Sequence, residues 1–294
     1  MTFREIHNNY TKTLQTLYST GEVAAITNII FLKFAGLSKS ELAVTGDHIA
    51  DVATDAALQG SLEKLLKHIP VQYITGEALF YNLKFKVNSQ VLIPRPETEE
   101  LVQEAISFLK TTKGRKVLDI GTGSGCIPIS VKKNIPHAEI ISIDISGGAL
   151  QIAAENAAAN NVQIDFRIMD FLNEKNHDTF PIFDVIISNP PYIPEEDKSA
   201  MDKNVLLHEP HLALFVPQHD PLLFYKKILS FAKQHLAENG KIFLETHEDH
   251  AKATAALFNT ENYLTEIKED MQGKERMLVV SRNNFTPLSI SATL

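Results

Sequence analysis

The sequence lacks the features of several protein classes. Its 294 residues include one cysteine, Cys126, so neither an internal disulfide nor a metal site built from several cysteines can form. We expect Cys126 to be a small packed residue. No apolar run approaches the roughly 18 uncharged residues that a membrane helix needs, and the opening MTFREIHNNYTKTL is too polar for a signal peptide. We therefore expect a cytoplasmic protein without a membrane partner.

Positively charged residues are fewer than negatively charged ones. Lys and Arg total 28 against 36 Asp and Glu, which gives a net charge of -8. This is the wrong sign for a protein whose affinity comes mainly from nucleic-acid phosphates. A protein or small-molecule substrate is therefore favoured, and stable nucleic-acid binding is not expected. The chain contains no internal repeat or low-complexity tract, and its length and 44% hydrophobic content fit two globular domains.

The pattern of apolar residues changes along the chain. Residues 1–70 show apolar positions at three- and four-residue spacing, which predicts a small helical domain for recognition or support. Residues 71–96 contain an alternating LKFKV and predict a β-hairpin linker that ends in a stiff Pro94-Arg95-Pro96. Residues 97–294 begin with a helix over ETEELVQEAISFLK, and their tail, 283–294, is expected to fray.

Strand and helix patterns alternate after residue 113. Strands are predicted at KVLDI, EIISIDI, IDFRIMD, FDVIIS, GKIFLET and RMLVVS, with helices at CIPISVKKN, GALQIAAENAAANN and PLLFYKKILSFAKQHL. Such alternation predicts an α/β domain with a mostly parallel, Rossmann-like sheet covered on both faces. Ligand sites in such sheets lie beyond the carboxyl ends of the strands, near a switch in strand order.

A glycine-rich turn, LDIGTGSGC, follows the first of these strands. Its glycines let the backbone turn tightly and approach a ligand, and Pro128 marks the start of the next helix. Asp144 ends the second strand, where a carboxylate can accept hydrogen bonds from ribose hydroxyls. Dinucleotide-binding folds share this arrangement, but Cys126 stands where their fingerprint has its third glycine. The shorter turn suits a nucleoside without a pyrophosphate.

Asp170-Phe171 forms a third loop after the strand IDFRIMD, and a fourth loop, Asn189-Pro190-Pro191-Tyr192, follows the strand FDVIIS. Two prolines end any strand and hold the next residues in a nearly fixed shape. By itself the pair is most often a surface turn.

Taken in order, the four loops resemble those of class I S-adenosylmethionine-dependent methyltransferases that act on amino groups. Within that group, QYITGEALFYNLKFKVNSQVLIPRPETEELV and NPPYIPEED resemble the protein-(glutamine-N5) methyltransferases of class 1 peptide-chain release factors, over about residues 71–281. The resemblance implies methylation of a release-factor glutamine with S-adenosyl-L-methionine. A release factor would be the partner, and we expect a monomer.

The resemblance also implies roles for particular residues. Asn189 and Pro190 would accept the two N–H bonds of the substrate amide, and Tyr192 would pack against its plane, which makes these three the catalytic group. The substrate set adds Pro191. The expected cofactor set is Gly121, Thr122, Gly123, Ser124, Gly125, Asp144, Phe171 and Asn189, with Asp170 near the adenine. Phe171 has core packing as an equal alternative, and Arg95 and Thr98 are near the pocket or form a hinge.

Some positions depart from the family pattern. The glycines expected after the "EP..AL" segment and after Glu245 are missing from HEPHLALFVPQHDPL and LETHEDH. These departures concern the loops around the substrate. His247 and His250 could in principle bind a metal, but a solvated face is favoured, so no metal site is assigned.

Three rival functions remain open. A methyltransferase of a nucleic-acid base shares the Asn-Pro-Pro-Tyr chemistry but would need the base flipped out, and the acidic composition opposes it. A non-catalytic binding module would keep the cofactor pocket but has no need of Asn189 and Tyr192. A nicotinamide dehydrogenase ranks last, because the third glycine is missing.

Overall fold

The structure is a computed structural model that describes residues 1–283. The chain forms two compact units. The first comprises Met1–Ala78, Val87–Ser89 and Ala200–Glu209, and the second comprises Leu79–Lys86, Gln90–Ser199 and the chain from Pro210 onward. The frayed tail expected from the sequence lies, from residue 284 on, outside the described residues.

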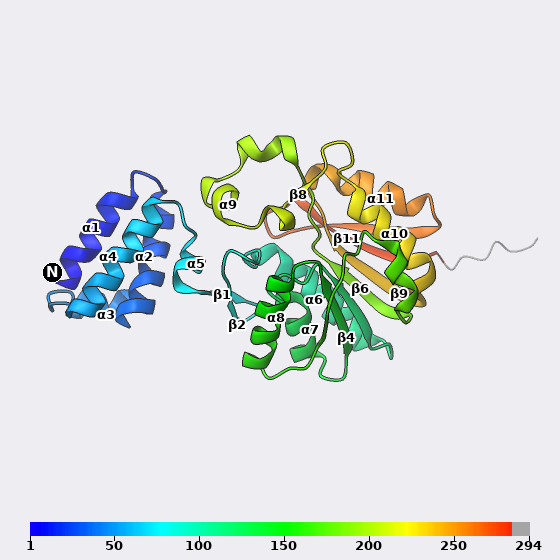
Figure 1. Cartoon of the computed structure of the whole chain (residues 1–294), viewed down its shortest axis with the longest axis horizontal. Helices are drawn as coiled ribbons and strands as arrows, with labels where there is room; N and C mark the ends of the chain where they lie inside the picture. The colour runs from blue at the N-terminus through cyan, green and yellow to red at the C-terminus, as the bar shows by residue number, and fades with distance from the viewer. Residues whose placement is uncertain (284–294) are drawn as a thin grey trace, which may run out of the picture. The chain divides into compact units, whose positions relative to one another are not determined.

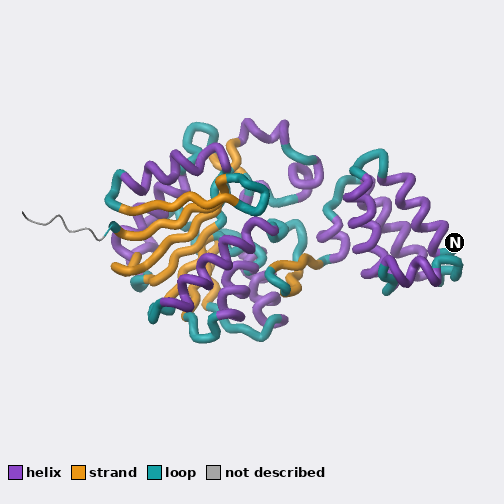
Figure 2. The backbone as a smooth tube through the Cα atoms, turned by 180° about the vertical axis from the view of Figure 1, so that it is seen from behind, coloured by secondary structure: helices purple, strands orange, loops and turns teal. Residues whose placement is uncertain are grey.

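The first unit consists mainly of helices, most of which form one bundle (Figures 1 and 2). Its helices are α1 (Phe3–Leu14), α2 (Thr20–Ala35), α3 (Lys39–Thr45), α4 (Val52–Leu66), α5 (Val71–Thr75) and α9 (Lys203–His208). Fully buried Ile6, Tyr10, Ile30 and Leu58 join α1, α2 and α4 in one core. The bundle predicted for the N-terminal region is therefore present.

Three of these helices begin with the same device. Thr2, Ser19 and Ser38 each cap a helix whose third residue is a glutamate that returns a hydrogen bond to the cap. This capping box satisfies backbone N–H groups that have no partner within the helix.

No single helix among the described residues is long and apolar enough to cross a membrane. Helices α2 and α3 together have the length and apolar composition of a membrane span, but they are bent by 70° where they meet.

The linker differs partly from its prediction. The hairpin exists as β1 (Glu77–Phe80) and β2 (Leu83–Lys86), but Val71–Thr75 is helical. Gly76 ends α5 in the left-handed conformation, with φ of 74°, and its N–H bonds to the Gln72 carbonyl. Glycine adopts this conformation without steric cost, so the helical turn can end there before the strands begin.

The second unit is built on a seven-stranded sheet in the order β10-β11-β9-β6-β3-β4-β5. Its strands are β3 (Lys116–Ile120), β4 (Glu139–Asp144), β5 (Asp165–Ile168), β6 (Phe183–Ser188), β9 (Leu236–Glu245), β10 (Tyr263–Glu269) and β11 (Glu275–Arg282). β11 pairs antiparallel with β9 and β10, and the other pairs are parallel. The strand order changes direction between β3 and β6, where a ligand site is expected.

Helices cover both faces of this sheet (Figures 1 and 2). They are α6 (Pro96–Thr111), α7 (Cys126–Asn134), α8 (Gly147–Ala159), α10 (Leu223–His235) and α11 (Ala251–Asn259). Side chains alternate between the faces: Val185 and Ile187 of β6 pack in the core beneath α6 and α7, whereas Ile186 packs beneath α10 and α11.

Short elements complete the unit. They are the 3-10 helices η1 (Glu174–Thr179), η2 (Glu195–Ala200, shared with the first unit), η3 (His211–Ala213) and η4 (Glu248–His250), and the two-residue strands β7 (Ile193–Pro194) and β8 (Phe215–Val216). The predicted fold class is confirmed, and Cys126 is buried as expected. The sequence analysis missed α11 and β10, and β9 begins at Leu236, before its predicted start at Gly240.

Candidate active site

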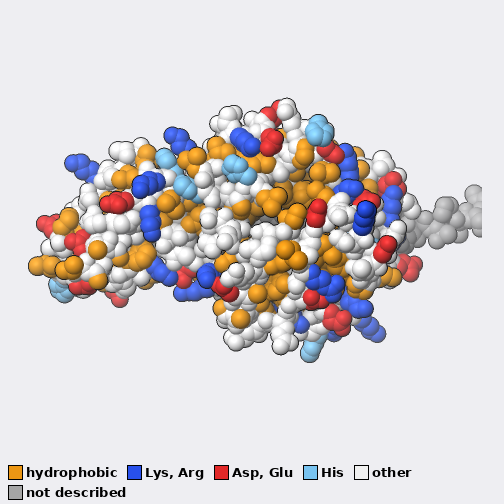
Figure 3. Space-filling model, viewed as in Figure 1, with side chains coloured by type: hydrophobic (Ala, Val, Ile, Leu, Met, Phe, Trp, Pro, Cys, Tyr) orange, Lys and Arg blue, Asp and Glu red, His pale blue; other side chains and the backbone are white. Residues whose placement is uncertain are grey.

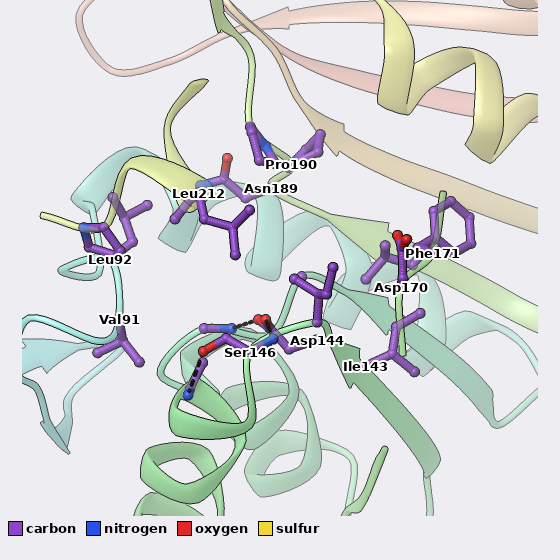
Figure 4. A pocket seen from close by; sticks show the side chains of 18 of the residues that line it. Val91, Leu92, Ile143, Asp144, Ser146, Asp170, Phe171, Asn189, Pro190 and Leu212 are labelled. Carbon is purple, nitrogen blue, oxygen red and sulfur yellow. Dashed lines mark hydrogen bonds between the residues drawn. The ribbon is translucent and has the colours of Figure 1, made fainter. Parts of the chain in front are cut away.

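A cavity of about 180 Å³ lies at the carboxyl ends of β3, β4 and β6, within the second unit. Figure 4 shows part of its wall, with Asp144 and Ser146 facing Asn189 and Pro190, and with Asp170 and Phe171 to one side. The predicted site residues that line it are Gly121, Gly123, Asp144, Phe171, Asn189, Pro190 and Pro191. Sequence motifs far apart in the chain thus converge on one cavity, at the switch in strand order.

The glycine-rich turn has left-handed backbone angles that residues with a Cβ adopt only at an energetic cost. Gly121, Gly123 and Gly125 have φ of 79°, 52° and 79°. A Cβ on Gly125 would lie 3.1 Å from the Cβ of Ala153 in α8, so the turn and helix are in close contact. Gly121 and Gly123 present bare backbone to the cavity, while Thr122, Ser124 and Gly125 are not part of its lining. Thr122 and Ser124 are instead buried.

Asp144 ends β4 and holds the glycine turn. Its Oδ2 accepts from the N–H of Gly123 at 2.9 Å, and its Oδ1 accepts from the N–H of Ser146 at 2.9 Å. Burial raises the pKa of Asp144, while these backbone bonds act in the opposite direction. Each carboxylate oxygen has a second lone pair, so Asp144 can also accept hydroxyl hydrogen bonds from a ligand in the cavity.

The sequence left two roles open for Phe171, a place at the cofactor and packing in the core. It lines the cavity, and it also packs in the core, stacked on His177 at 4.9 Å and edge-on to Phe231 at 5.6 Å. Asp170, beside it, lines the same wall and accepts from the N–H of Leu172 at 3.0 Å. The phenyl ring is therefore held rigidly where a flat apolar group could lie against it.

The Asn189-Pro190-Pro191-Tyr192 loop follows β6 directly. Ser188 anchors its start by donating a hydrogen bond to the Ile120 carbonyl at 2.7 Å, and the Nδ2 of Asn189 donates to Thr98 Oγ1 at 3.2 Å. Within residues 1–283, neither the Oδ1 of Asn189 nor the carbonyl of Pro190 accepts a hydrogen bond. Two rigidly placed acceptors thus remain available on this loop.

Comparison with known proteins decides the family. The family described as "PrmC N-terminal domain" matches residues 5–76, and "Methyltransferase small domain" matches residues 101–214. The "Release factor glutamine methyltransferase" of Flavobacterium psychrophilum is 39% identical over 96% of this chain and 99% of its own. The protein of that name from Bacteroides thetaiotaomicron is 37% identical over 92% and 97%. The chain belongs to the release factor glutamine methyltransferase family.

A solved structure agrees with the fold of this family member. The catalytic domain of hMettl16, in complex with MAT2A 3'UTR hairpin 6, has a TM-score of 0.53 and 13% identity, covering 80% of this chain and 82% of that one. At that identity the likeness concerns the fold alone. The protein is a methyltransferase whose methyl donor is S-adenosyl-L-methionine, as the sequence resemblance implied.

The cavity of this methyltransferase fits that donor chemically. The bare backbone of Gly121 and Gly123 permits close approach, and Asp144 offers acceptors for ribose hydroxyls. Ile143 and Phe171 supply an apolar surface for a flat base. A dehydrogenase, ranked last from the sequence, does not fit the family. Among residues 1–283 no three His, Cys, Asp or Glu side chains cluster so as to hold a metal, and the rings of His247 and His250 lie 5.7 Å apart.

The methyltransferase also contains a buried network that sequence analysis did not find. Tyr192 is absent from the cavity lining, and its hydroxyl donates to Glu245 Oε1 at 3.2 Å. Thr98, on α6, donates to Glu245 Oε2 at 2.6 Å. Burial raises the pKa of both Tyr192 and Glu245, although hydrogen bonds from Thr98 and Tyr192 oppose the shift at Glu245. Only the sheet register could have indicated that Glu245 lies beside Asn189.

Asn156 of α8 is a second residue that sequence analysis missed. Its Oδ1 accepts from the Lys86 N–H at 2.6 Å, and its Nδ2 donates to the Ser124 carbonyl at 2.9 Å. The side chain thereby ties the hairpin strand β2 to the glycine turn. An asparagine inside an alanine-rich helical pattern gave no sign of this role.

The loops that depart from the family pattern occupy different places. Pro210, Leu212 and Ala213 line the cavity. His208, two residues before them, belongs to the first unit, where its Nε2 is 2.9 Å from the Lys67 carbonyl.

Proposed function

We propose that this protein transfers the methyl group of S-adenosyl-L-methionine to the side-chain amide nitrogen of a glutamine in class 1 peptide-chain release factors. The observation that carries the proposal is the pair of acceptors on one stiff loop of the cavity, Asn189 Oδ1 and the Pro190 carbonyl. The two relatives are release factor glutamine methyltransferases by name, which supports the same substrate.

An amide nitrogen is a poor nucleophile, because its lone pair is delocalised into the carbonyl. In our proposal Asn189 and Pro190 accept its two N–H bonds and hold the nitrogen towards the methyl. Pro190 and Pro191 keep these acceptors fixed, so little reorganisation accompanies transfer. The donor, when bound, supplies an electrophilic methyl on a positively charged sulfur. The nitrogen can lose its proton after transfer, so no side chain is assigned as general base.

We assign further roles on the same basis. Tyr192 packs its ring near the amide plane while its hydroxyl stays on Glu245. The cofactor contacts are Gly121, Gly123, Asp144, Phe171 and Asn189 at the cavity wall, with Thr122, Ser124 and Gly125 shaping the turn.

We assign the docking of the release factor to residues 1–70, with residues 71–96 as the linker and 97–294 as the methyltransferase domain. We also expect the protein to act as a monomer in the cytoplasm, without stable nucleic-acid binding. On the face seen in Figure 3, Lys and Arg side chains are scattered among Asp and Glu rather than gathered in a stripe, which favours a protein substrate over RNA or DNA.

The test is transfer of labelled methyl to a purified class 1 release factor, beside DNA and RNA. We expect one added methyl, located on a glutamine by peptide mapping. Asn189→Ala should abolish transfer and keep cofactor binding measurable. Asn134→Ala, at the end of α7 and outside the cavity lining, is the matched control. Label on nucleic acid instead of the factor would refute the proposal.

A further inference from the structure

Glu245 lies beside Asn189 because of the sheet register. Strands β6 and β9 run parallel, with Ser188 opposite Leu244, so Asn189 and Glu245, the next residue along each segment, lie at the same edge of the sheet. Glu245 is 2% exposed. A buried carboxylate is costly unless its oxygens are hydrogen-bonded, so its partners are informative.

The hydrogen bonds around Glu245 have only one direction when it is ionised. A carboxylate only accepts, so Thr98 must donate its single hydroxyl proton to Glu245 Oε2, at 2.6 Å. Thr98 Oγ1 can then only accept from Asn189, whose Nδ2 lies 3.2 Å away. With the reverse orientation, Asn189 Oδ1 would face an oxygen that has no proton left to give.

The pKa of Glu245 is raised, but both of its oxygens accept hydrogen bonds, from Thr98 and from Tyr192, as a carboxylate requires. Burial raises the pKa of Glu245, and Glu97 adds to this shift. The hydroxyls of Thr98 and Tyr192 and the positive charge of Arg276, on β11, act against it. Each neighbour that opposes the shift favours the ionised, acceptor-only state.

We propose that Glu245, acting through Thr98, is a positioning residue that fixes the Asn189 carboxamide with its oxygen towards the substrate, so that the site selects an amide over a carboxylate. The inference rests on the proposed function, because it explains how a glutamine is distinguished from a glutamate of nearly the same shape. A glutamine side chain offers two N–H donors to Asn189 Oδ1 and the Pro190 carbonyl. A glutamate carboxylate offers only oxygens, which these acceptors repel.

Glu245→Gln gives the sharpest test, because it reverses the direction of the hydrogen bonds that run from Asn189 through Thr98 to residue 245. We call this chain of hydrogen bonds the relay. If Tyr192 still donates to the amide oxygen of the new side chain, the amide NH2 faces Thr98 and donates to it. Thr98 then turns its proton towards Asn189 Oδ1, and the Nδ2 of Asn189 faces the substrate as a donor. Thr98→Val breaks the relay without reversing it, and Thr98→Ser retains the hydroxyl.

The assay compares binding of a class 1 release factor with that of the same factor carrying glutamate at the methylated glutamine. We expect the wild type to prefer the glutamine form by about tenfold or more. Thr98→Val should reduce the preference to about threefold or less, and Glu245→Gln should reduce it without inverting it, because the Pro190 carbonyl still repels a carboxylate. Thr98→Ser should stay within about twofold of the wild type, since its hydroxyl makes the same two bonds.

Thr254→Val is the matched control, because Thr254 is a buried threonine of α11 whose Oγ1 has no partner among the described residues. It should leave the preference unchanged. Thermal unfolding and cofactor affinity of each variant identify effects that are only structural. A wild-type preference retained in both Glu245→Gln and Thr98→Val would overturn the inference.

A second readout does not need the substrate. The side-chain amide protons of Asn189, assigned in nuclear magnetic resonance spectra with Asn189→Ala, should exchange slowly in the wild type and in Thr98→Ser. Exchange should be at least about tenfold faster in Thr98→Val, because the acceptor is gone. If the wild type neither binds nor methylates release factors, the proposed function fails, while protection that depends on Thr98 still supports the orientation of Asn189. Unchanged exchange in Thr98→Val overturns that orientation.

Discussion

Replacing Gly125 with alanine should destabilise the second unit and weaken cofactor binding. Gly125 has φ of 79°, a left-handed conformation that costs a residue with a Cβ about 1–2 kcal/mol. The added Cβ would lie 3.0 Å from Ile129 Cδ1 and 3.3 Å from the Ala153 Cα. The isoleucine tip can rotate away, but the Cα belongs to the α8 backbone, so overpacking adds about 1–3 kcal/mol. Together these effects predict a loss of about 2–5 kcal/mol of unfolding free energy.

The assay is urea unfolding followed by circular dichroism, with S-adenosyl-L-methionine added to identify the transition of the cofactor-binding unit. Gly147→Ala is the control from the same unit, because its Cβ would meet only Ile168 Cδ1 at 3.5 Å, an ordinary contact, and its φ is not left-handed. That control should stay within about 0.5 kcal/mol of the wild type. A similarly small change for Gly125→Ala would refute the reasoning.

Two further substitutions concern buried polar residues next to the cavity. Asn156→Ala should cost about 1–3 kcal/mol of unfolding free energy and lower cofactor affinity, since it leaves the buried Ser124 carbonyl unpaired; urea unfolding within about 0.5 kcal/mol of the wild type would contradict this. Burial raises the pKa of Asp119 to about 7. Because the pKa is raised on folding, the wild type should lose stability relative to Asp119→Asn as the pH rises from about 4 through 7. Equal differences in unfolding free energy at pH 5 and pH 8 would exclude this linkage.

The sequence predicted those elements whose ends are marked by local chemistry. β3, α7 and β6 have the predicted bounds, because a glycine turn and a proline pair fix where a strand must stop or a helix must begin. The segment after Glu245 has no such marks, and both α11 and β10 were missed there. The residues of α5 were included in the hairpin linker because of the alternation at LKFKV further on, but packing in the bundle core favours a helical turn there.

The same distinction applies to the site. Asn189 and the glycine turn could be predicted because each is a short motif next to its own strand. The role of Glu245 depends on which strand lies beside β6, and no local pattern specifies that β9 takes this place. The loop sequence can therefore identify which groups touch a substrate, but not which way their dipoles point.

The orientation of these dipoles explains why a carboxylate is useful at the end of β9. An apolar residue there would avoid the desolvation cost but would leave Thr98 free to turn its proton either way. The Asn189 carboxamide would then have two orientations of similar energy, and only one suits an amide substrate. An ionised Glu245 has no proton, so it removes this choice. Charge placed outside the cavity thus sets the hydrogen-bonding character of a side chain inside it.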